Sequence, residues 1–507
     1  ETSVERAPAK TNPARGRIPV TDVLLTHSYH LAYDRKQVQK MQPYPPLGTL
    51  YAAALLRAHG YSVALFDTML EDPAEFSRAL RRHRPRVLAI YEDNFNFLSK
   101  MCLVRMREVA RQMCAEARDA AIPVVVNGSD ASDHPQEYFN AGAGLILQGE
   151  AEWTLLEVVQ NLVAGKPATS VPGVVFPREG TIQRSAQRAR IRSLDALPFP
   201  ARDLVDIESY RGLWTRAHGY FSLNAVASRG CPFRCNWCAK PIYGSAFQCR
   251  SAASVAQEMQ ELKQTWCAEH IWFADDIFAL QRHWAEDLGR EVEQRNAALP
   301  FKIQSRVDLM TEDTARGLRR AGCAETWMGV ESGSQAVLDA MDKDLDVANV
   351  PAARERLRRH GIRACYFLQF GYPGETLTDI EKTIRLVRDT RPDDIGVSVS
   401  YPLPGTPFYE RVRAELAQKS NWVDSGELAM MFRGAYTSEF YGALHDALHG
   451  EVDSWRTVVD PAEVERRWVR VAQLEATCRN PHPAPAPAAP EPRVITAWNP
   501  RPAQEMA

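Results

Sequence analysis

Five short apolar runs in the first third of the chain alternate with segments of helical periodicity. The runs are TDVLLTH, YSVALFD, RVLAIYED, PVVVNG and GLILQG. Helical patterns such as LGTLYAAALLRAHG and MCLVRMREVARQM lie between them. Strands that alternate with helices form a parallel sheet covered on both faces. We therefore predict an α/β domain with a doubly wound, flavodoxin-like sheet over residues 19–165. Ligands of such sheets bind beyond the carboxyl ends of the strands.

The same alternation begins again near residue 221, after a connector at 166–220 that is rich in Pro and Gly. Six further apolar runs are SLNAVAS, HIWFADDIF, FKIQSRVDL, ETWMGVES, RACYFLQFG and IGVSVSYPL. Helical patterns such as SVAQEMQELKQTW separate them. Six βα units predict a partial TIM barrel over 221–407, with its chemistry at the carboxyl ends of the strands.

The remaining segments flank these two units. Residues 408–480 have the pattern of a small helical cap. Residues 1–18 are polar, and we expect a disordered leader there. Residues 481–507 include PHPAPAPAAPEPR, and such a Pro- and Ala-rich tail cannot bury a core.

Composition and charge narrow the class of protein. The 507 residues are 45% hydrophobic and carry a formal net charge of −2. This near-neutral balance argues against a nucleic acid or a membrane surface as the general partner. No apolar run reaches about 18 residues, and the first residues lack the apolar core of a signal peptide. We expect a monomeric cytoplasmic protein without a membrane span.

Three of the ten cysteines lie close together in SRGCPFRCNWCAK. Cys231, Cys235 and Cys238 follow the first predicted barrel strand, in the loop where barrel proteins keep their reactive groups. Thiolates are soft ligands that suit iron–sulfur clusters or zinc. A 4Fe–4S cluster takes four ligands, so three cysteines leave one iron open. Arg229, nearby in sequence, could offset the cluster's negative charge.

Two other interpretations of the cysteines stay open. Cys249 could supply a fourth ligand, which would make a structural zinc site or an electron-transfer cluster. The three thiols could also be ordinary buried cysteines. A second candidate metal site is HDALHG, where His445 and His449 share one helical face without an evident third ligand. A surface or substrate-pocket role suits those two histidines better.

The cysteine spacing resembles the signature of the radical S-adenosylmethionine (SAM) superfamily. The resemblance implies a 4Fe–4S cluster on the three cysteines and SAM on the open iron. It also implies SAM contacts from Trp237, between the last two cysteines, and from polar residues at the later strand ends. Those residues are Asp275, Asp276, Arg306 and Glu331. Each could instead be a solvated or helix-capping residue.

The first domain resembles the cobalamin-binding domain that is fused to many radical SAM enzymes. The motif Asp-x-His-x-x-Gly, whose His coordinates cobalt in many cobalamin proteins, is absent from the sequence. The loop YEDNFNF is our candidate for the lower face of the cobalt, through Asn94, Phe95 or Asn96, although Phe95 and Phe97 could be core residues. Candidates around the nucleotide tail and the last turn are Asn127, Gly128, Ser129, Asp130, Gly149 and Glu150. An acidic first turn would also suit the helix dipole.

The combined resemblance implies a reaction class. A 5′-deoxyadenosyl radical would take a hydrogen from a small-molecule substrate, and methylcobalamin would then methylate the carbon. An unactivated C–H bond has no acidic proton, so the cofactors must carry that step. An external reductant of the flavodoxin or ferredoxin type would supply the electron. A cyclase or rearrangement enzyme without methyl transfer, or a cobalamin or cluster sensor without turnover, remains an alternative.

Overall fold

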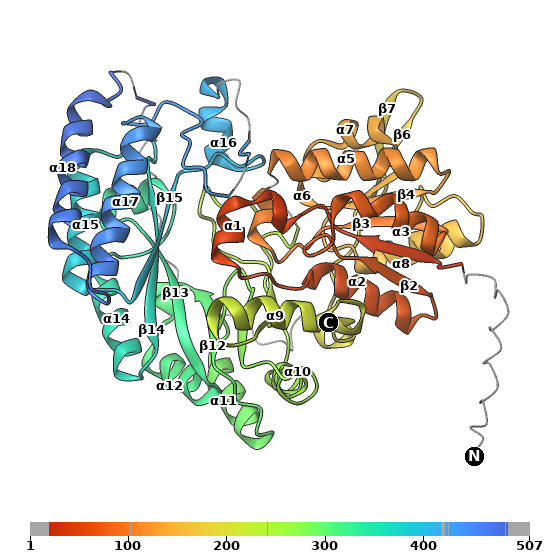
Figure 1. The fold of residues 1–507 in the computed structure, drawn as a ribbon, viewed down its shortest axis with the longest axis horizontal. Helices are drawn as coiled ribbons and strands as arrows, with labels where there is room; N and C mark the ends of the chain where they lie inside the picture. The colour runs from red at the N-terminus through yellow and green to blue at the C-terminus, as the bar shows by residue number, and fades with distance from the viewer. Residues whose placement is uncertain are drawn as a thin grey trace, which may run out of the picture.

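The computed structural model describes residues 20–101, 103–240, 242–416, 421–423, 425–481 and 483–484. The expected leader lies outside these ranges, as does almost all of the expected tail. Figure 1 shows the N-terminal sheet and its helices on one side of the molecule, and the barrel strands with the C-terminal helices on the other. No helix within these ranges is both long and apolar enough to cross a membrane.

The N-terminal unit is the predicted parallel sheet. Its five parallel strands have the order β2-β1-β3-β4-β5. They are β1 (Val23–Thr26), β2 (Val63–Phe66), β3 (Val87–Tyr91), β4 (Val124–Asn127) and β5 (Leu145–Leu147). Every residue of β1, β3, β4 and β5 is buried, as a sheet covered on both faces requires. The flavodoxin-like prediction is confirmed.

Helices cover both faces of this sheet. On one face, α2 (Leu47–Ala58) and α8 (Glu152–Val163) share a core with the strands. On the other, α3 (Phe76–His83) and α5 (Val104–Asp119) form a second core. Shorter helices follow the strand ends: α1 (Arg35–Lys40), α4 (Phe97–Met101), α6 (Ser129–Asp133) and α7 (Pro135–Ala141).

The segment expected to be a plain connector contains regular structure. An antiparallel hairpin, β6 (Val174–Arg178) and β7 (Thr181–Arg184), extends the sheet beyond β5. Helix α9 (Ile207–His218) follows it. The buried Arg202 donates to Glu258 of α10 at 2.8 Å and to the Asn224 carbonyl at 2.8 Å, which fixes this segment to the barrel.

The second unit is the predicted partial barrel. Its six strands are all parallel and stand in sequence order. They are β8 (Ser222–Ala225), β11 (His270–Phe273), β12 (Phe301–Ser305), β13 (Cys323–Glu331), β14 (Arg363–Phe370) and β15 (Asp394–Val399). The outer helices are α10 (Ala252–Gln264), α11 (Trp284–Gln294), α12 (Glu312–Ala321), α14 (Asn349–Arg359) and α15 (Leu377–Thr390). Between α12 and α14 lies the short α13 (Gln335–Ala340).

Residues alternate between the two faces of each barrel strand. In β12, Phe301 and Ile303 are buried against the outer helices, whereas Lys302 and Gln304 are partly exposed. Because side chains alternate along a strand, Lys302 and Gln304 face the inside of the barrel. The inner wall of the barrel therefore carries side chains that remain partly exposed, although other parts of the chain surround the barrel.

The N-terminal unit joins the first barrel strand through a short segment before α2. The Trp214 indole donates to the Pro43 carbonyl at 2.6 Å. The Asn224 amide of β8 donates to the Pro45 carbonyl at 2.9 Å, and the Tyr44 hydroxyl lies 3.1 Å from Ser222 Oγ. These buried bonds hold the carboxyl ends of the first sheet beside the barrel.

The C-terminal helices close the far edge of the barrel. They are α16 (Pro407–Val412), α17 (Ser438–Ser454) and α18 (Pro461–Thr477). Helix α17 packs its apolar face against β15, and α18 packs on α17 (Figure 1). At the end of β14, the buried Glu375 accepts a hydrogen bond from the Gly371 amide at 2.6 Å. Its second oxygen and the Tyr441 hydroxyl of α17 are both buried without a partner among the described residues.

The Glu375 carboxyl, in the turn after β14, makes the free energy of unfolding depend on pH. Burial raises the pKa of Glu375 to about 8, so the folded state keeps the proton to a higher pH than the unfolded state. Stability therefore falls as the pH rises from the ordinary glutamate range through about 8. Between pH 6 and pH 9 the unfolding free energy of the parent protein should fall. For Glu375→Gln this fall should be smaller by about 2 kcal/mol. Urea unfolding at both pH values measures this difference.

Glu463→Gln is the matched control. The partly exposed Glu463 pairs with Arg466 at 2.7 Å, and the hydrogen bond from Arg466 lowers the pKa of the Glu463 carboxyl. This carboxyl is ionised throughout the range from pH 6 to pH 9, so its removal should leave the slope of stability against pH unchanged. A Glu375→Gln variant with the same slope as the parent protein would contradict the prediction.

Candidate active site at the junction of the two sheets

The cysteine loop follows β8 and is held in a tight turn. Its first residues form β9 (Ser228–Arg229), which pairs antiparallel with β10 (Gln248–Cys249). Gly230 has a φ of 77°, and a Cβ there would clash with the Ala246 carbonyl oxygen. Glycine alone suits this position because it has neither a Cβ nor a penalty for left-handed backbone.

Asn236, between the second and third cysteines, anchors the loop to the rest of the barrel. Its side-chain amide donates to the Ala340 carbonyl at 2.8 Å and to Asp342 at 2.9 Å. Its carbonyl oxygen accepts from the Tyr372 hydroxyl at 2.6 Å, and Arg411 donates to that hydroxyl at 2.9 Å. The sequence does not indicate this anchor, because the partners of Asn236 lie more than 100 residues further along the chain.

The three thiols of the loop lie near one another. Burial, together with Cys235, Cys231 and Asp276, raises the pKa of Cys238 to about 12. Burial also raises the pKa of Cys231, while Lys240 opposes this shift. Without metal these two thiols are therefore neutral, and a metal must displace their protons. Within the described residues, no three Cys, His, Asp or Glu side chains are spaced for one metal ion. Three soft thiol donors in one loop are the ligand type that a 4Fe–4S cluster takes, with one iron left open.

Cys249 and the histidine pair show no such grouping. Cys249 pairs with Ser228 across the β9–β10 ladder, and burial raises the pKa of its thiol. The rings of His445 and His449 are 4.3 Å apart, and burial and His445 lower the pKa of His449 to about 4.

The two adjacent acids after β11, Asp275 and Asp276, lie in different environments. Asp275 is buried and accepts from the Ser228 hydroxyl at 2.6 Å and the Ala227 amide at 3.1 Å. Burial raises the pKa of Asp275 to about 7, whereas those hydrogen bonds lower it. Asp276 is exposed and raises the pKa values of Cys231 and Cys238, which places its carboxylate beside the thiols. Asp275 thus supports the loop, and Asp276 lies close enough to act on the thiols through its charge.

The remaining strand-end residues are engaged in contacts within the protein. The Arg306 guanidinium lies 3.7 Å from the Phe233 ring centroid and donates to the Lys343 carbonyl at 3.0 Å. Glu331 pairs with Lys343 at 2.8 Å, and both side chains are buried. Glu331 has a φ of 62° where the β13–β14 register shifts, an unusual conformation for a residue other than glycine.

Trp237 packs against a small apolar cluster below the C-terminal helices. That cluster includes Tyr372, Phe408 and Phe432. The Trp237 indole nitrogen is buried and has no hydrogen-bond partner among the described residues. A buried N–H of this kind can donate a hydrogen bond to an acceptor atom of a bound ligand.

A buried ion-pair group joins the cysteine loop to the N-terminal sheet. Arg229 contacts Glu150 at 2.7 Å and Glu152 at 2.8 Å, at the start of α8. None of the three side chains is more than 8% exposed. The guanidinium also lies 5.4 Å from the Phe95 ring and 5.1 Å from the Tyr243 ring. We call Arg229, Glu150 and Glu152 the interdomain clamp. Arg229 therefore balances these carboxylates, two residues before the first cysteine.

Other predicted residues at the N-terminal strand ends form a hydrogen-bonded row. The Asn94 side-chain amide donates to the Asn127 side-chain oxygen Oδ1 at 2.7 Å. The Asn127 side-chain nitrogen donates to the Leu147 carbonyl at 2.9 Å and the Gly149 carbonyl at 3.3 Å. Phe95 is buried and stacks on Tyr243 of the cysteine loop at 5.3 Å. A Cβ on Gly128 would lie 2.7 Å from Glu92 Cγ. These groups lie close together and hold the segments at the ends of β3, β4 and β5 in position relative to one another.

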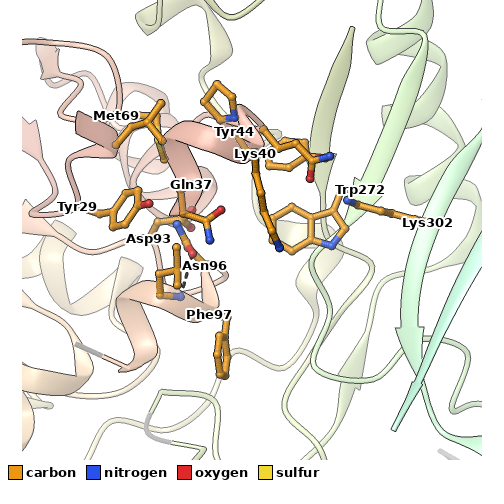
Figure 2. A pocket seen from close by; sticks show the side chains of 14 residues that line it. Tyr29, Gln37, Lys40, Tyr44, Met69, Asp93, Asn96, Phe97, Trp272 and Lys302 are labelled. Carbon is orange, nitrogen blue, oxygen red and sulfur yellow. Dashed lines mark hydrogen bonds between the residues drawn. The ribbon is translucent and has the colours of Figure 1, made fainter. Parts of the chain in front are cut away.

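Two cavities open beside this row. One, of about 230 Å³, lies between the N-terminal strand ends and the barrel wall, with Asn96 and Phe97 in its lining (Figure 2). The other, of about 70 Å³, is lined by Ser129, Asp130 and Ala239 of the cysteine loop. Both lie where a doubly wound sheet binds its ligands. Their position and mixed polar lining fit parts of a large cofactor placed between the two units.

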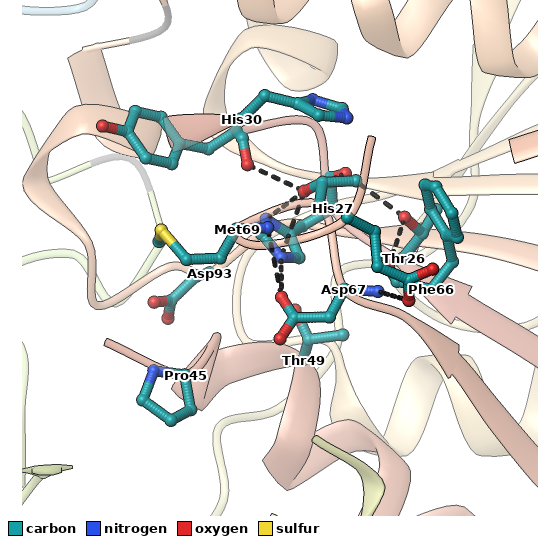
Figure 3. Close-up of polar contacts among 12 residues, drawn as sticks. Thr26, His27, His30, Pro45, Thr49, Phe66, Asp67, Met69 and Asp93 are labelled. Carbon is teal, nitrogen blue, oxygen red and sulfur yellow. Dashed lines mark hydrogen bonds and ion pairs between the residues drawn. The ribbon is translucent and has the colours of Figure 1, made fainter. Parts of the chain in front are cut away.

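A buried polar network fixes the loops behind the first cavity (Figure 3). The His27 ring nitrogens lie 3.3 Å from Asp67 Oδ1 and 2.9 Å from the Thr68 hydroxyl. That hydroxyl also lies 2.7 Å from the Tyr29 carbonyl. The Tyr210 hydroxyl of α9 donates to Asp67 at 2.8 Å. The network sets the position of Tyr29, which lines the cavity, and was not predicted from sequence.

Comparison with known families assigns both units. Residues 226–387 match the radical SAM superfamily, and residues 41–159 match the B12 binding domain. The protein is thus a two-domain α/β protein that places a cobalamin-binding sheet against a radical SAM half-barrel. It is a cobalamin-dependent radical SAM enzyme, with a 4Fe–4S cluster, SAM and cobalamin as its cofactors.

The relatives of this chain include methyltransferases and cyclases. An uncharacterized methyltransferase of Pyrococcus horikoshii is 24% identical over 75% of this chain and 81% of its own. The hopanoid C-3 methylase of Methylococcus capsulatus is 25% identical, covering 79% of this chain and 75% of its own. The anaerobic magnesium-protoporphyrin IX monomethyl ester cyclase of Rubrivivax gelatinosus is 22% identical, covering 73% and 66%.

Solved structures share the fold. The methyltransferase TsrM from Kitasatospora setae has a TM-score of 0.65 at 20% identity, covering 79% of this chain and 76% of its own. The enzyme OxsB has a TM-score of 0.67 at 17% identity, covering 90% and 72%. At these identities, the likeness concerns the fold.

The interdomain clamp yields a direct prediction. Arg229→Met leaves Glu150 and Glu152 buried without a cation, which costs about 3–5 kcal/mol of unfolding free energy. We also expect the cluster content after anaerobic reconstitution to fall, because the loop that carries the cysteines loses its anchor. Chemical denaturation and iron analysis measure the two effects.

The control is Arg358→Met, which breaks the exposed pair of Arg358 with Glu355. Solvent screens this pair, so its loss should leave stability and cluster content close to those of the parent protein. Equal stability of the two variants would contradict the role assigned to the clamp.

Proposed function

We propose that this enzyme methylates an unactivated carbon of a small-molecule substrate. The observation that carries the proposal is the group of three thiols at the end of β8, clamped directly to the strand ends of the B12-binding domain. The methyltransferases among its relatives support the same reaction. When bound, the cluster and SAM supply a 5′-deoxyadenosyl radical, and cobalamin supplies the methyl group.

In this proposal Cys231, Cys235 and Cys238 bind the cluster through their thiolates, and Asn236 holds their loop. Asp276, beside the thiols, contacts SAM, and the Trp237 N–H binds a SAM acceptor. Asp275, Arg306 and Glu331 act as positioning residues, because their polar atoms already hold the loops around the thiols.

In the N-terminal domain, residues at the ends of the strands support or contact cobalamin. Asn94, Phe95, Asn127, Gly128 and Gly149 shape and support the edge. Asn96 and Ser129, which line the two cavities, make the contacts. Burial of the site between two domains keeps water and other small molecules from the reactive intermediates. An external flavodoxin- or ferredoxin-type reductant delivers the electron in the cytoplasm.

A second candidate is ring formation without methyl transfer. The relationship to the cyclase of Rubrivivax gelatinosus favours it, because that relative spans 73% of this chain. The two reactions differ in one product, since methyl transfer from SAM releases S-adenosylhomocysteine and ring formation does not.

The test is anaerobic turnover of reconstituted enzyme with SAM, cobalamin, reductant and a cell extract as the source of substrate. We expect 5′-deoxyadenosine and S-adenosylhomocysteine, both measured by mass spectrometry. Cys238→Ala should lower the formation of 5′-deoxyadenosine at least about 100-fold, because the cluster loses a ligand.

Cys249→Ala is the matched control and should retain activity, since Cys249 lies on the β10 ladder. Release of 5′-deoxyadenosine without S-adenosylhomocysteine would indicate the cyclase class. Absence of both products from the cluster-loaded enzyme would indicate a sensor and would refute the proposed function.

A further inference from the structure

The 230 Å³ cavity between the two units has one wall from the barrel. Trp272 of β11 and Lys302 of β12 form that wall (Figure 2). The N-terminal unit supplies Tyr29, Lys40 and Tyr44 to the lining, and the Tyr44 ring packs against Trp272 with centroids 4.8 Å apart. The cavity therefore reaches the inner face of the barrel, and none of its lining residues belongs to the cysteine loop.

The ammonium of Lys302 has no hydrogen bond and no ion pair with any part of the chain that the structure describes. It lies 5.7 Å from the Trp272 ring and 5.9 Å from the Tyr44 ring, so the aromatic faces provide its close surroundings. Burial lowers the pKa of Lys302, which shows that its charge is poorly solvated. A desolvated cation facing a cavity binds an anion more strongly than an exposed lysine does.

Two acids lie near Lys302, and neither forms an ion pair with it in the part of the chain that the structure describes. Glu325 stands opposite Lys302 in the β12–β13 register and raises its pKa, against the effect of burial. Glu325, on the neighbouring strand, accepts from the Trp327 indole at 2.6 Å and pairs with Arg363. Asp93 lines the cavity, but its carboxylate accepts from the Gly48 amide at 2.9 Å, and burial raises its pKa. Lys40, at the edge of the cavity, adds a second positive charge.

Beyond Lys302 the inner wall becomes apolar and aromatic. Trp327 stacks on Phe367 with ring centroids 4.9 Å apart. Gly396 lies against both rings, since a Cβ there would be 3.2 Å from Phe367. Gln304 faces the same side of β12 as Lys302.

We infer that the substrate carries a carboxylate or phosphate that binds Lys302, and an apolar body that packs on Trp272 and Tyr44. This inference rests on the proposed function, because it assigns the substrate class of the same enzyme. A charge-assisted hydrogen bond in a partly desolvated site supplies the recognition, and the aromatic rings supply the apolar contact. Lys302 is then a specificity-determining residue.

The experiment uses the enzyme loaded with cluster and cobalamin, and three probes that share a phenyl ring. They are 3-phenylpropionate, 2-phenylethyl phosphate and the neutral 3-phenylpropionamide. Titration calorimetry up to about 10 mM should show saturable binding of at least one anion and weaker binding of the amide. The tighter anion identifies the carboxylate or the phosphate as the group recognised.

Lys302→Gln should weaken binding of that anion about 10- to 100-fold and leave amide binding unchanged. Lys302→Arg should restore affinity to within about threefold, because it keeps the charge. Lys263→Gln is the matched control, since Lys263 lies partly exposed on α10 and donates to the Asn296 carbonyl. Iron and cobalamin contents of each variant confirm that it is folded and loaded.

Three results would overturn the inference: no saturable binding of either anion, equal affinities of Lys302→Gln and the parent enzyme, or loss of cobalamin from Lys302→Gln with retention in Lys302→Arg. The last result would assign Lys302 to cobalamin binding and not to the substrate. Formation of 5′-deoxyadenosine by the parent enzyme is measured separately, so failure of this inference remains distinct from failure of the proposed function.

Discussion

The interdomain clamp is the constraint on which the rest of the site depends. Arg229 places a full positive charge in a buried position, and Glu150 and Glu152 of the other domain balance it. Since breaking a buried pair leaves an uncompensated charge, the two domains cannot separate at this point without a large cost. The cysteine loop begins two residues after Arg229. Its position relative to the cobalamin-binding sheet is therefore set by electrostatics rather than by the linker.

Much of the polar chemistry at the strand ends serves to hold loops in place. Asp275 supports the backbone of the cysteine loop, and Glu331 pairs with Lys343. Arg306 stacks on Phe233 within that loop. Residues that look like ligand contacts in the sequence thus form a scaffold around the thiols. A radical enzyme needs such a scaffold, because its reactive groups must be aligned closely and kept from water.

The fold could be predicted because it follows local patterns. Alternating apolar runs and amphipathic segments indicated both sheets, and the cysteine spacing located the loop. The hairpin β6–β7 was missed because its strands are short and largely exposed, so no strong apolar pattern marks them. The interactions of the site residues could not be predicted because their partners are distant in sequence. Arg229 and Glu150 are 79 residues apart, and Asn236 and Tyr372 are 136 apart. Only tertiary structure shows that Glu150 balances Arg229, or that Lys302 lines a cavity.

The central claim is that three cysteines hold the cluster and leave one iron for SAM beside the cobalamin-binding sheet. Pulsed electron–nuclear double resonance tests this claim most directly, on the reduced enzyme with SAM that carries nitrogen-15 in its amino group. The account predicts a coupling between the cluster and the labelled nitrogen. A cluster that shows no such coupling with SAM present in excess would contradict it.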